Sequence, residues 1–166
     1  MLKLIQEAHV SPRAASSSVL VIEEHPFQRS AIAKRLNDLG VPRVLQAARA
    51  ADALELLGAR ASSIALILSS VDVPETDGLE LLRTLARALA AEARQTPIAL
   101  LSTRERALLR RVETEAAECG LKLIGTLQRP VTDDELRAVL VRALACGGPT
   151  GPRDGRFMVL TRSRFG

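Results

Sequence analysis

Polar side chains follow four short apolar runs of this sequence, each close to the point where the run ends. They are Glu23, Glu24, Ser69, Ser70, Asp72, Ser102, Thr103 and Arg129. Adjacent carboxylates are ligands that a divalent cation prefers, and a guanidinium beside them suits a phosphoryl oxygen. If the fold brings these groups together, the sequence predicts a site for a metal ion and a phosphoryl group.

The same runs belong to a regular alternation of strand-like and helix-like segments. Continuous apolar runs at 19–22, 64–68 and 97–101 are typical of strands buried on both faces, and 41–47 and 121–127 are predicted to be two further strands. Between them, apolar residues recur at helical spacing. Proline, glycine and capping pairs mark the expected helix ends: Pro26, Gly40, Gly58, Gly120, Asp77–Glu80, Ser102–Glu105 and Thr132–Glu135.

Five such units predict an α/β fold with helices on both faces of a parallel sheet. We expect a flavodoxin-like, doubly wound, five-stranded sheet in the order 2-1-3-4-5, a (βα)5 single domain. Ligands of such sheets bind beyond the carboxyl ends of the strands, which is where the polar residues would gather.

Composition and charge narrow the classes of function. The chain has 166 residues and a net charge of +4. Acidic and basic residues balance within 18–146, so the excess charge lies on an N-terminal tail (1–17) and a flexible basic C-terminal tail (147–166). With three phenylalanines as its only aromatic residues, the chain is not expected to bind nucleic acid. It has no membrane-length apolar run or signal-peptide pattern and only two cysteines, so we expect a cytoplasmic protein.

Between residues 18 and 146 the sequence resembles the receiver domain of bacterial two-component response regulators. The stretches that carry the resemblance are Val19–Arg29, Val73–Glu80, Pro97–Ser102 and Gly125–Pro130. The first of them, together with Cys119–Gly125, is most similar to receivers attached to EAL-type cyclic-di-GMP phosphodiesterases. The resemblance implies a domain of phosphorelay signal transduction rather than an enzyme.

The resemblance also implies roles for the polar residues. Glu23 and Glu24 fall on the acidic pair that holds Mg²⁺ in the family, with Glu24 the better metal candidate. Ser102 falls on the hydroxyl, and Arg129 on the lysine, that contact the phosphoryl group. The acceptor aspartate is missing, because Ser70 stands four residues before Pro74.

These replacements predict a degenerate receiver. A serine hydroxyl is a poor nucleophile without a base, and Ser70 also removes a negative charge from the metal site. Asp72 falls where the family mainly uses a backbone carbonyl, so its carboxylate would reach the metal from a different place. We therefore expect no cofactor, with Mg²⁺ binding weak or lost, and an ion pair between Arg129 and Glu23 or Glu24.

The function expected of such a domain is protein–protein interaction, through self-association or a signalling partner. The surface implied by the resemblance is the fourth helix, fifth strand and fifth helix. Thr126 stands where the family has its aromatic switch. Two alternatives stay open: a Mg²⁺-dependent response regulator that accepts phosphoryl groups, and an unrelated flavodoxin-like protein that binds a small ligand. Ser102 could also simply be a helix N-cap.

Overall fold

The computed structural model describes residues 17–60, 63–72, 78–91, 95–103 and 106–146. Five parallel strands form one sheet in the order β2-β1-β3-β4-β5, as the sequence predicted. They are β1 (Ser18–Ile22), β2 (Arg43–Ala47), β3 (Ile64–Ser70), β4 (Ile98–Ser102) and β5 (Leu123–Gln128). The tails expected at 1–17 and 147–166 lie, except for residue 17, outside the described residues.

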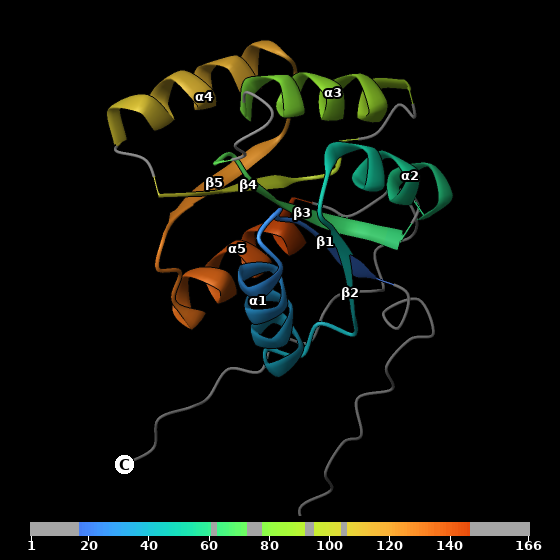
Figure 1. Ribbon diagram of the computed structural model, residues 1–166, viewed down its shortest axis with the longest axis vertical. Coiled ribbons are helices and arrows are strands. Elements are labelled where there is room, and N and C mark those ends of the chain that lie inside the picture. Colours follow the sequence, from blue (N-terminus) through green and yellow to red (C-terminus); the bar gives the residue numbers. More distant parts are fainter. Residues whose placement is uncertain (1–16, 61–62, 73–77, 92–94, 104–105, 147–166) are drawn as a thin grey trace, which may run out of the picture.

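Five helices cover the two faces of the sheet (Figure 1). They are α1 (Pro26–Asp38), α2 (Ala50–Arg60), α3 (Gly78–Ala91), α4 (Arg106–Glu118) and α5 (Asp133–Ala145). Helices α1 and α5 lie on one face, and α2, α3 and α4 lie on the other. No helix of the described segments is both long and apolar enough to span a bilayer.

The three central strands are apolar because both of their faces are covered. Every residue of β1, β3 and β4 is buried. Side chains alternate along a strand, so Val19 and Val21 pack with α1 and α5, whereas Leu20 and Ile22 pack with the opposite layer. The two outer strands are less covered: Arg43 and Gln46 of β2 are exposed.

Several predicted boundaries were wrong by one or a few residues. The strand expected at 64–68 continues through Ser69 and Ser70, which are buried and pair with Leu100 and Leu101 of β4. Backbone hydrogen bonding extends this strand beyond its apolar run, because the sheet ladder satisfies the backbone whatever the side chain. Helix α2 also continues past Gly58 to Arg60, since glycine at an exposed helix end is tolerated.

Other helix ends agree with the sequence. Pro26 begins α1, and Thr132 with Glu135 forms the predicted capping box at the start of α5. Gly120 follows α4 with a φ of 75°, a conformation that residues with a Cβ rarely adopt. The first residue of α3, Gly78, lies so close to β3 that an added Cβ would be 2.5 Å from the Val71 carbonyl oxygen.

Candidate functional site

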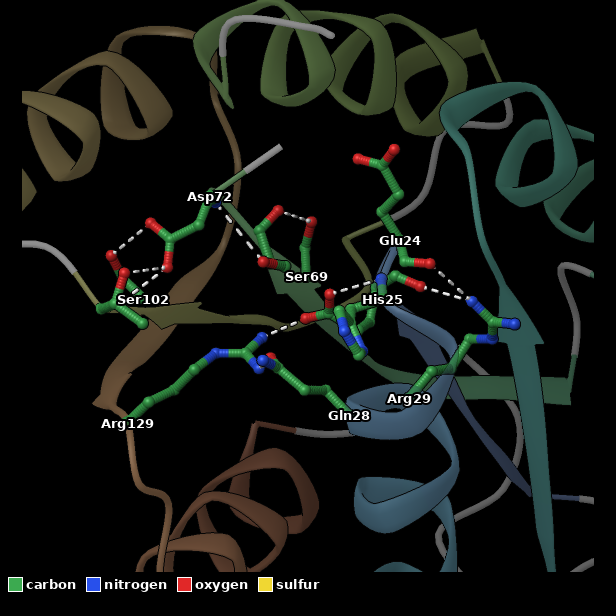
Figure 2. A network of polar contacts seen from close by, with 11 residues as sticks. Glu24, His25, Gln28, Arg29, Ser69, Asp72, Ser102 and Arg129 are labelled. Carbon is green, nitrogen blue, oxygen red and sulfur yellow. Dashed lines mark hydrogen bonds and ion pairs between the residues drawn. The ribbon is translucent and has the colours of Figure 1, made fainter. Parts of the chain in front are cut away.

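The polar residues singled out in the sequence gather at the carboxyl edge of the sheet (Figure 2). Glu23 and Glu24 follow β1, Ser69 and Ser70 end β3, Ser102 ends β4, and Arg129 follows β5. The carboxyl ends of four strands thus lie in one region, as expected because all strands of the sheet are parallel. The side chains there divide into two separate sets of contacts.

The first set is an ion pair between Arg129 and Glu23. Arg129 Nη2 donates to Glu23 Oε2, and the two side chains are only 12% and 6% exposed. Glu23 Oε1 also accepts a hydrogen bond of 2.9 Å from the main-chain N–H of His25. Arg129 Nη1 donates to Gln28 Oε1 on α1. The ion pair predicted for Arg129 is therefore present, and Glu23 is its carboxylate.

Glu24 is not part of this pair. In Figure 2 its carboxylate points away from Arg129. Its buried Oε2 has no hydrogen-bond partner among the described residues. Its main-chain oxygen accepts a bond of 3.1 Å from Arg29, whose Nη1 also donates at 2.8 Å to the main-chain oxygen of Glu23. The two neighbouring glutamates therefore face different surroundings.

The second set is centred on the Asp72 carboxylate. Ser102 Oγ donates to Asp72 Oδ1 at 3.0 Å, and Thr103 Oγ1 donates to Asp72 Oδ2 at 2.9 Å. The main-chain N–H of Thr103 donates to the same Oδ2. Ser102 is thus the last residue of β4 and a partner of Asp72. Its predicted capping partner, Glu105, lies outside the described residues, so the N-cap role stays a prediction.

Ser70 lies inside this edge of the sheet rather than on its surface. It is only 2% exposed and forms the end of β3. Its hydroxyl accepts a hydrogen bond of 3.4 Å from the main-chain N–H of Asp72. Ser69 Oγ donates to the main-chain oxygen of Ser70, also at 3.4 Å. The Ser70 hydroxyl is therefore almost completely covered in this structure.

The described residues do not fit the magnesium site that the acidic residues suggested. Glu23 faces a guanidinium, Glu24 points elsewhere, and Asp72 accepts hydrogen bonds from β4. Within the described ranges, no three His, Cys, Asp or Glu side chains are placed to share a metal ion. Arg129 thus holds, beside Glu23, the positive charge that a bound cation would bring.

Helix α4 makes polar contacts with both β5 and α3. Thr126 Oγ1 of β5 donates to Glu113 Oε1 at 2.7 Å. On the other side, Arg83 Nη2 of α3 lies 2.6 Å from Glu115 Oε1. Sequence reasoning missed Glu113, Gln28 and Thr103 as partners. No sequence signal marks a hydroxyl, an amide or one carboxylate among many as the partner of a distant residue.

The sequence matches a known domain family, and the fold matches solved structures. Residues 19–141 match the family described as Response regulator receiver domain. A search of curated proteins finds no match.

Among solved structures, the chemotaxis response regulator CheY4 of Vibrio cholerae is 25% identical with a TM-score of 0.60, covering 76% of this chain and 98% of that chain. The signal receiver domain of an HD domain-containing protein from Pseudomonas fluorescens Pf-5 is 24% identical with a TM-score of 0.63, covering 78% and 95%. A probable two-component system response regulator/GGDEF domain protein is 23% identical with a TM-score of 0.65, covering 80% of this chain and 51% of that chain.

Proposed function

The chain belongs to the response regulator receiver domain family, and from this premise we propose that it is a degenerate receiver of a two-component system. It does not accept a phosphoryl group, and it acts in the cytoplasm by binding another protein in one fixed conformation. The proposal includes no enzymatic activity and no resident metal ion. The likeness to receivers attached to EAL-type phosphodiesterases stays a prediction.

The observation that carries the proposal is that the side chains expected to contact the phosphoryl group already bind carboxylates of the chain. By the family resemblance these are the Ser102 hydroxyl and the Arg129 guanidinium. Ser102 already donates to Asp72, and Arg129 is already paired with Glu23. Both acceptors are carboxylates of the chain itself, so an incoming phosphoryl group would have to displace them. This arrangement supports a receiver that works without phosphoryl transfer.

The acceptor position gives independent support. Ser70 is 2% exposed, and among the residues that the structure describes its hydroxyl accepts from the main-chain N–H of Asp72 and contacts no His, Asp or Glu side chain. A serine without a base is a weak nucleophile, and a buried one cannot meet a phosphodonor. The residue type and the burial of Ser70 both support a receiver that does not accept a phosphoryl group.

The protein-binding half of the proposal concerns the face formed by α4, β5 and α5. Arg110, Arg111 and Glu118 of α4 are exposed, and Val141 of α5 is a large apolar residue that is 51% exposed. Mixed charges around an exposed apolar residue are a common composition for a transient interface. We propose that the partner, or a second copy of this chain, binds there.

Phosphoryl transfer is tested by incubating the full chain with acetyl phosphate and Mg²⁺ and measuring the intact mass. A receiver that retains the acceptor aspartate serves as the positive control under the same conditions. We expect no adduct on this chain and an adduct on the control. An adduct mapped near residue 70 would establish the alternative, a Mg²⁺-dependent phosphoryl acceptor.

The interface is tested separately by binding. The wild-type chain and the double variant Arg110→Glu/Arg111→Glu are compared as baits in an extract of the source organism, and as analytes in sedimentation for self-association. We expect a partner or a self-complex that the double variant loses. Equal binding by Arg43→Glu and wild type would locate the loss on α4, because Arg43 lies on β2 at the other edge of the sheet.

A further inference from the structure

The strongest unexplained contact is the one between Asp72 and the end of β4. Three donors from two consecutive residues meet one carboxylate: Ser102 Oγ, Thr103 N–H and Thr103 Oγ1. Asp72 belongs to the chain segment after β3, thirty positions earlier in the sequence. A main-chain N–H and two hydroxyls arranged in this way form a small site for an oxyanion.

The site has a defined place in the fold. Ser102 is fully buried at the end of β4, and Thr103 is exposed next to it. Helix α4 begins at Arg106, three residues after Thr103. The carboxylate therefore binds the chain just where it leaves the sheet and turns toward α4. Figure 2 shows Asp72 reaching across to Ser102 from the neighbouring strand.

We propose that the Asp72 carboxylate is a built-in anionic ligand of the β4 end and acts as the positioning residue for the start of α4. The site formed by Ser102 and Thr103 takes a small carboxylate, and in this chain a side chain supplies it permanently. The Thr126–Glu113 and Arg83–Glu115 contacts then hold the rest of α4 against β5 and α3. Carboxylates thus fix α4 at its entry and along its length.

This inference deepens the proposed function, since it names what sets the conformation of the proposed binding face. It also stands apart from that function in its test, which uses the free chain and needs neither a partner nor a phosphodonor. An adduct in the acetyl phosphate experiment would defeat the proposed function alone. Unchanged hydrogen–deuterium exchange in α4 of the Asp72 variants would contradict the role of Asp72 alone.

The readout is hydrogen–deuterium exchange of the backbone amides of α4, with those of α1 and α5 as internal references. In Asp72→Asn the side chain keeps its size but loses its charge and presents an N–H₂ group or a neutral oxygen to the donors. We expect exchange in α4 to become about tenfold faster, as for the loss of one hydrogen bond to a charged group. Exchange in α1 and α5 should not change.

The matched control is Asp52→Asn. The Asp52 carboxylate also accepts a main-chain N–H at a loop–helix junction, that of Arg49 at the start of α2, at 3.2 Å. The Asp52→Asn change should leave hydrogen–deuterium exchange in α4 unchanged. Unchanged exchange in α4 of Asp72→Asn would overturn the proposal. So would equal acceleration in all helices, because Asp72 would then only add to global stability.

A rescue experiment with a small anion tests the proposed anion site directly. In Asp72→Ala the three donors lose their carboxylate, and sodium formate should slow α4 exchange again where equal sodium chloride does not. The same formate should not rescue Asp72→Asn, whose side chain still fills the space. Formate acting no better than chloride would overturn the anion site. If Asp72→Ala does not fold in either salt, Thr103→Ala decides: faster exchange in α4 supports the proposal and unchanged exchange overturns it.

Discussion

At the scale of single residues, the Arg129–Glu23 pair differs from the other ion pairs of the described segments in how little solvent reaches it. Its side chains are 12% and 6% exposed, whereas those of Arg137 and Asp134 are 28% and 94% exposed. Burial removes the hydration of both charges, and each then depends on the other for compensation. The pair is thus fixed by the cost of separating it.

Replacing Arg129 by methionine should therefore destabilise the protein. The change leaves Glu23 buried without its counter-charge, and such losses reach about 3–5 kcal/mol. Guanidinium unfolding of the wild type and of Arg129→Met measures the difference in free energy of unfolding. Arg137→Met, which leaves the 94% exposed Asp134 carboxylate in water, should cost only about 0–1 kcal/mol. Similar losses in the two variants would show that the Arg129 pair is solvated.

The residue scale also shows where sequence reasoning succeeds. An ion pair of Arg129 with Glu23 or Glu24 was predictable because these charges follow strands that end at the same edge of the sheet, but the sequence did not select Glu23. The contact from Asp72 to Ser102 and Thr103 was not predictable, because the direction of a short polar side chain after a strand depends on the local backbone. The same holds for Thr126 and Glu113, where nothing in the sequence selects one glutamate of α4 over another.

At the scale of secondary-structure elements, the close approach of α3 to β3 depends on a missing side chain. A Cβ at Gly78 would lie 2.5 Å from the Val71 carbonyl oxygen and 3.1 Å from the Val71 Cβ. Backbone on both sides of this contact leaves no flexible group to move aside. The absence of a Cβ thus lets the helix start directly beside the end of the strand.

The two glycines within helices should therefore respond in opposite ways to alanine. Gly78→Ala should lower the free energy of unfolding by about 1–3 kcal/mol, the range for overpacking, although alanine favours helices. In Gly58→Ala, the added Cβ in α2 has no atom within 4 Å, so this change should raise the free energy of unfolding by about 0.4–1 kcal/mol. Thermal or denaturant melts of both variants give the signs. A gain for Gly78→Ala would mean that α3 can shift at no cost.

The start of α5 gives a prediction that depends on pH. Glu135 Oε2 accepts from the main-chain N–H of Thr132 and from its hydroxyl, each at 2.8 Å, and these bonds hold the pKa of Glu135 below its ordinary value of 4.5. A lowered pKa in the folded state means that the charged form stabilises the fold above pH 4.5. That contribution is lost as the pH falls through the lowered pKa.

Glu135→Gln should accordingly destabilise the protein at pH 7, by about 0.3–1 kcal/mol for an exposed charge at a helix start. The difference from wild type should shrink in urea melts at progressively lower pH. Asp38→Asn, which removes the carboxylate of an exposed ion pair near the end of α1, controls for a general loss of charge. A difference that stays constant across the pH range would contradict the capping role of the Glu135 charge.

At the scale of the whole molecule, two apolar layers enclose the sheet. The sequence predicted them well because continuous apolar runs can only be strands covered on both faces, as β1, β3 and β4 are. It predicted the strand ends less well, since Ser69 and Ser70 extend β3 through backbone pairing that side-chain polarity does not reveal. The order of the strands was therefore predictable from the alternation of strands and helices, whereas the residues at which the strands end were not.

The extent of the domain gives the last prediction. We expect the fold to need only residues 18–146, since among the described residues the buried side chains of both layers already form two apolar clusters between Val19 and Ala143. Deleting residues 149–166 should leave the melting temperature nearly unchanged. Calorimetry of the full and shortened chains measures it. A large fall would show that the apolar stretch Phe157–Leu160 contributes to the core.

The exposed edge of the sheet bears on how the protein behaves when crowded with copies of itself. Among the described residues, strand β2 has a neighbour on one side only, and Val44 and Leu45 in its middle are half-buried. An apolar edge of this kind invites a strand of another molecule, the first step of amyloid-like aggregation. The exposed Arg43 opposes that pairing, because two stacked molecules would bring like charges together. Arg43 thus has two roles: its main chain pairs with Ser18 of β1, and its exposed side chain favours colloidal solubility of the domain.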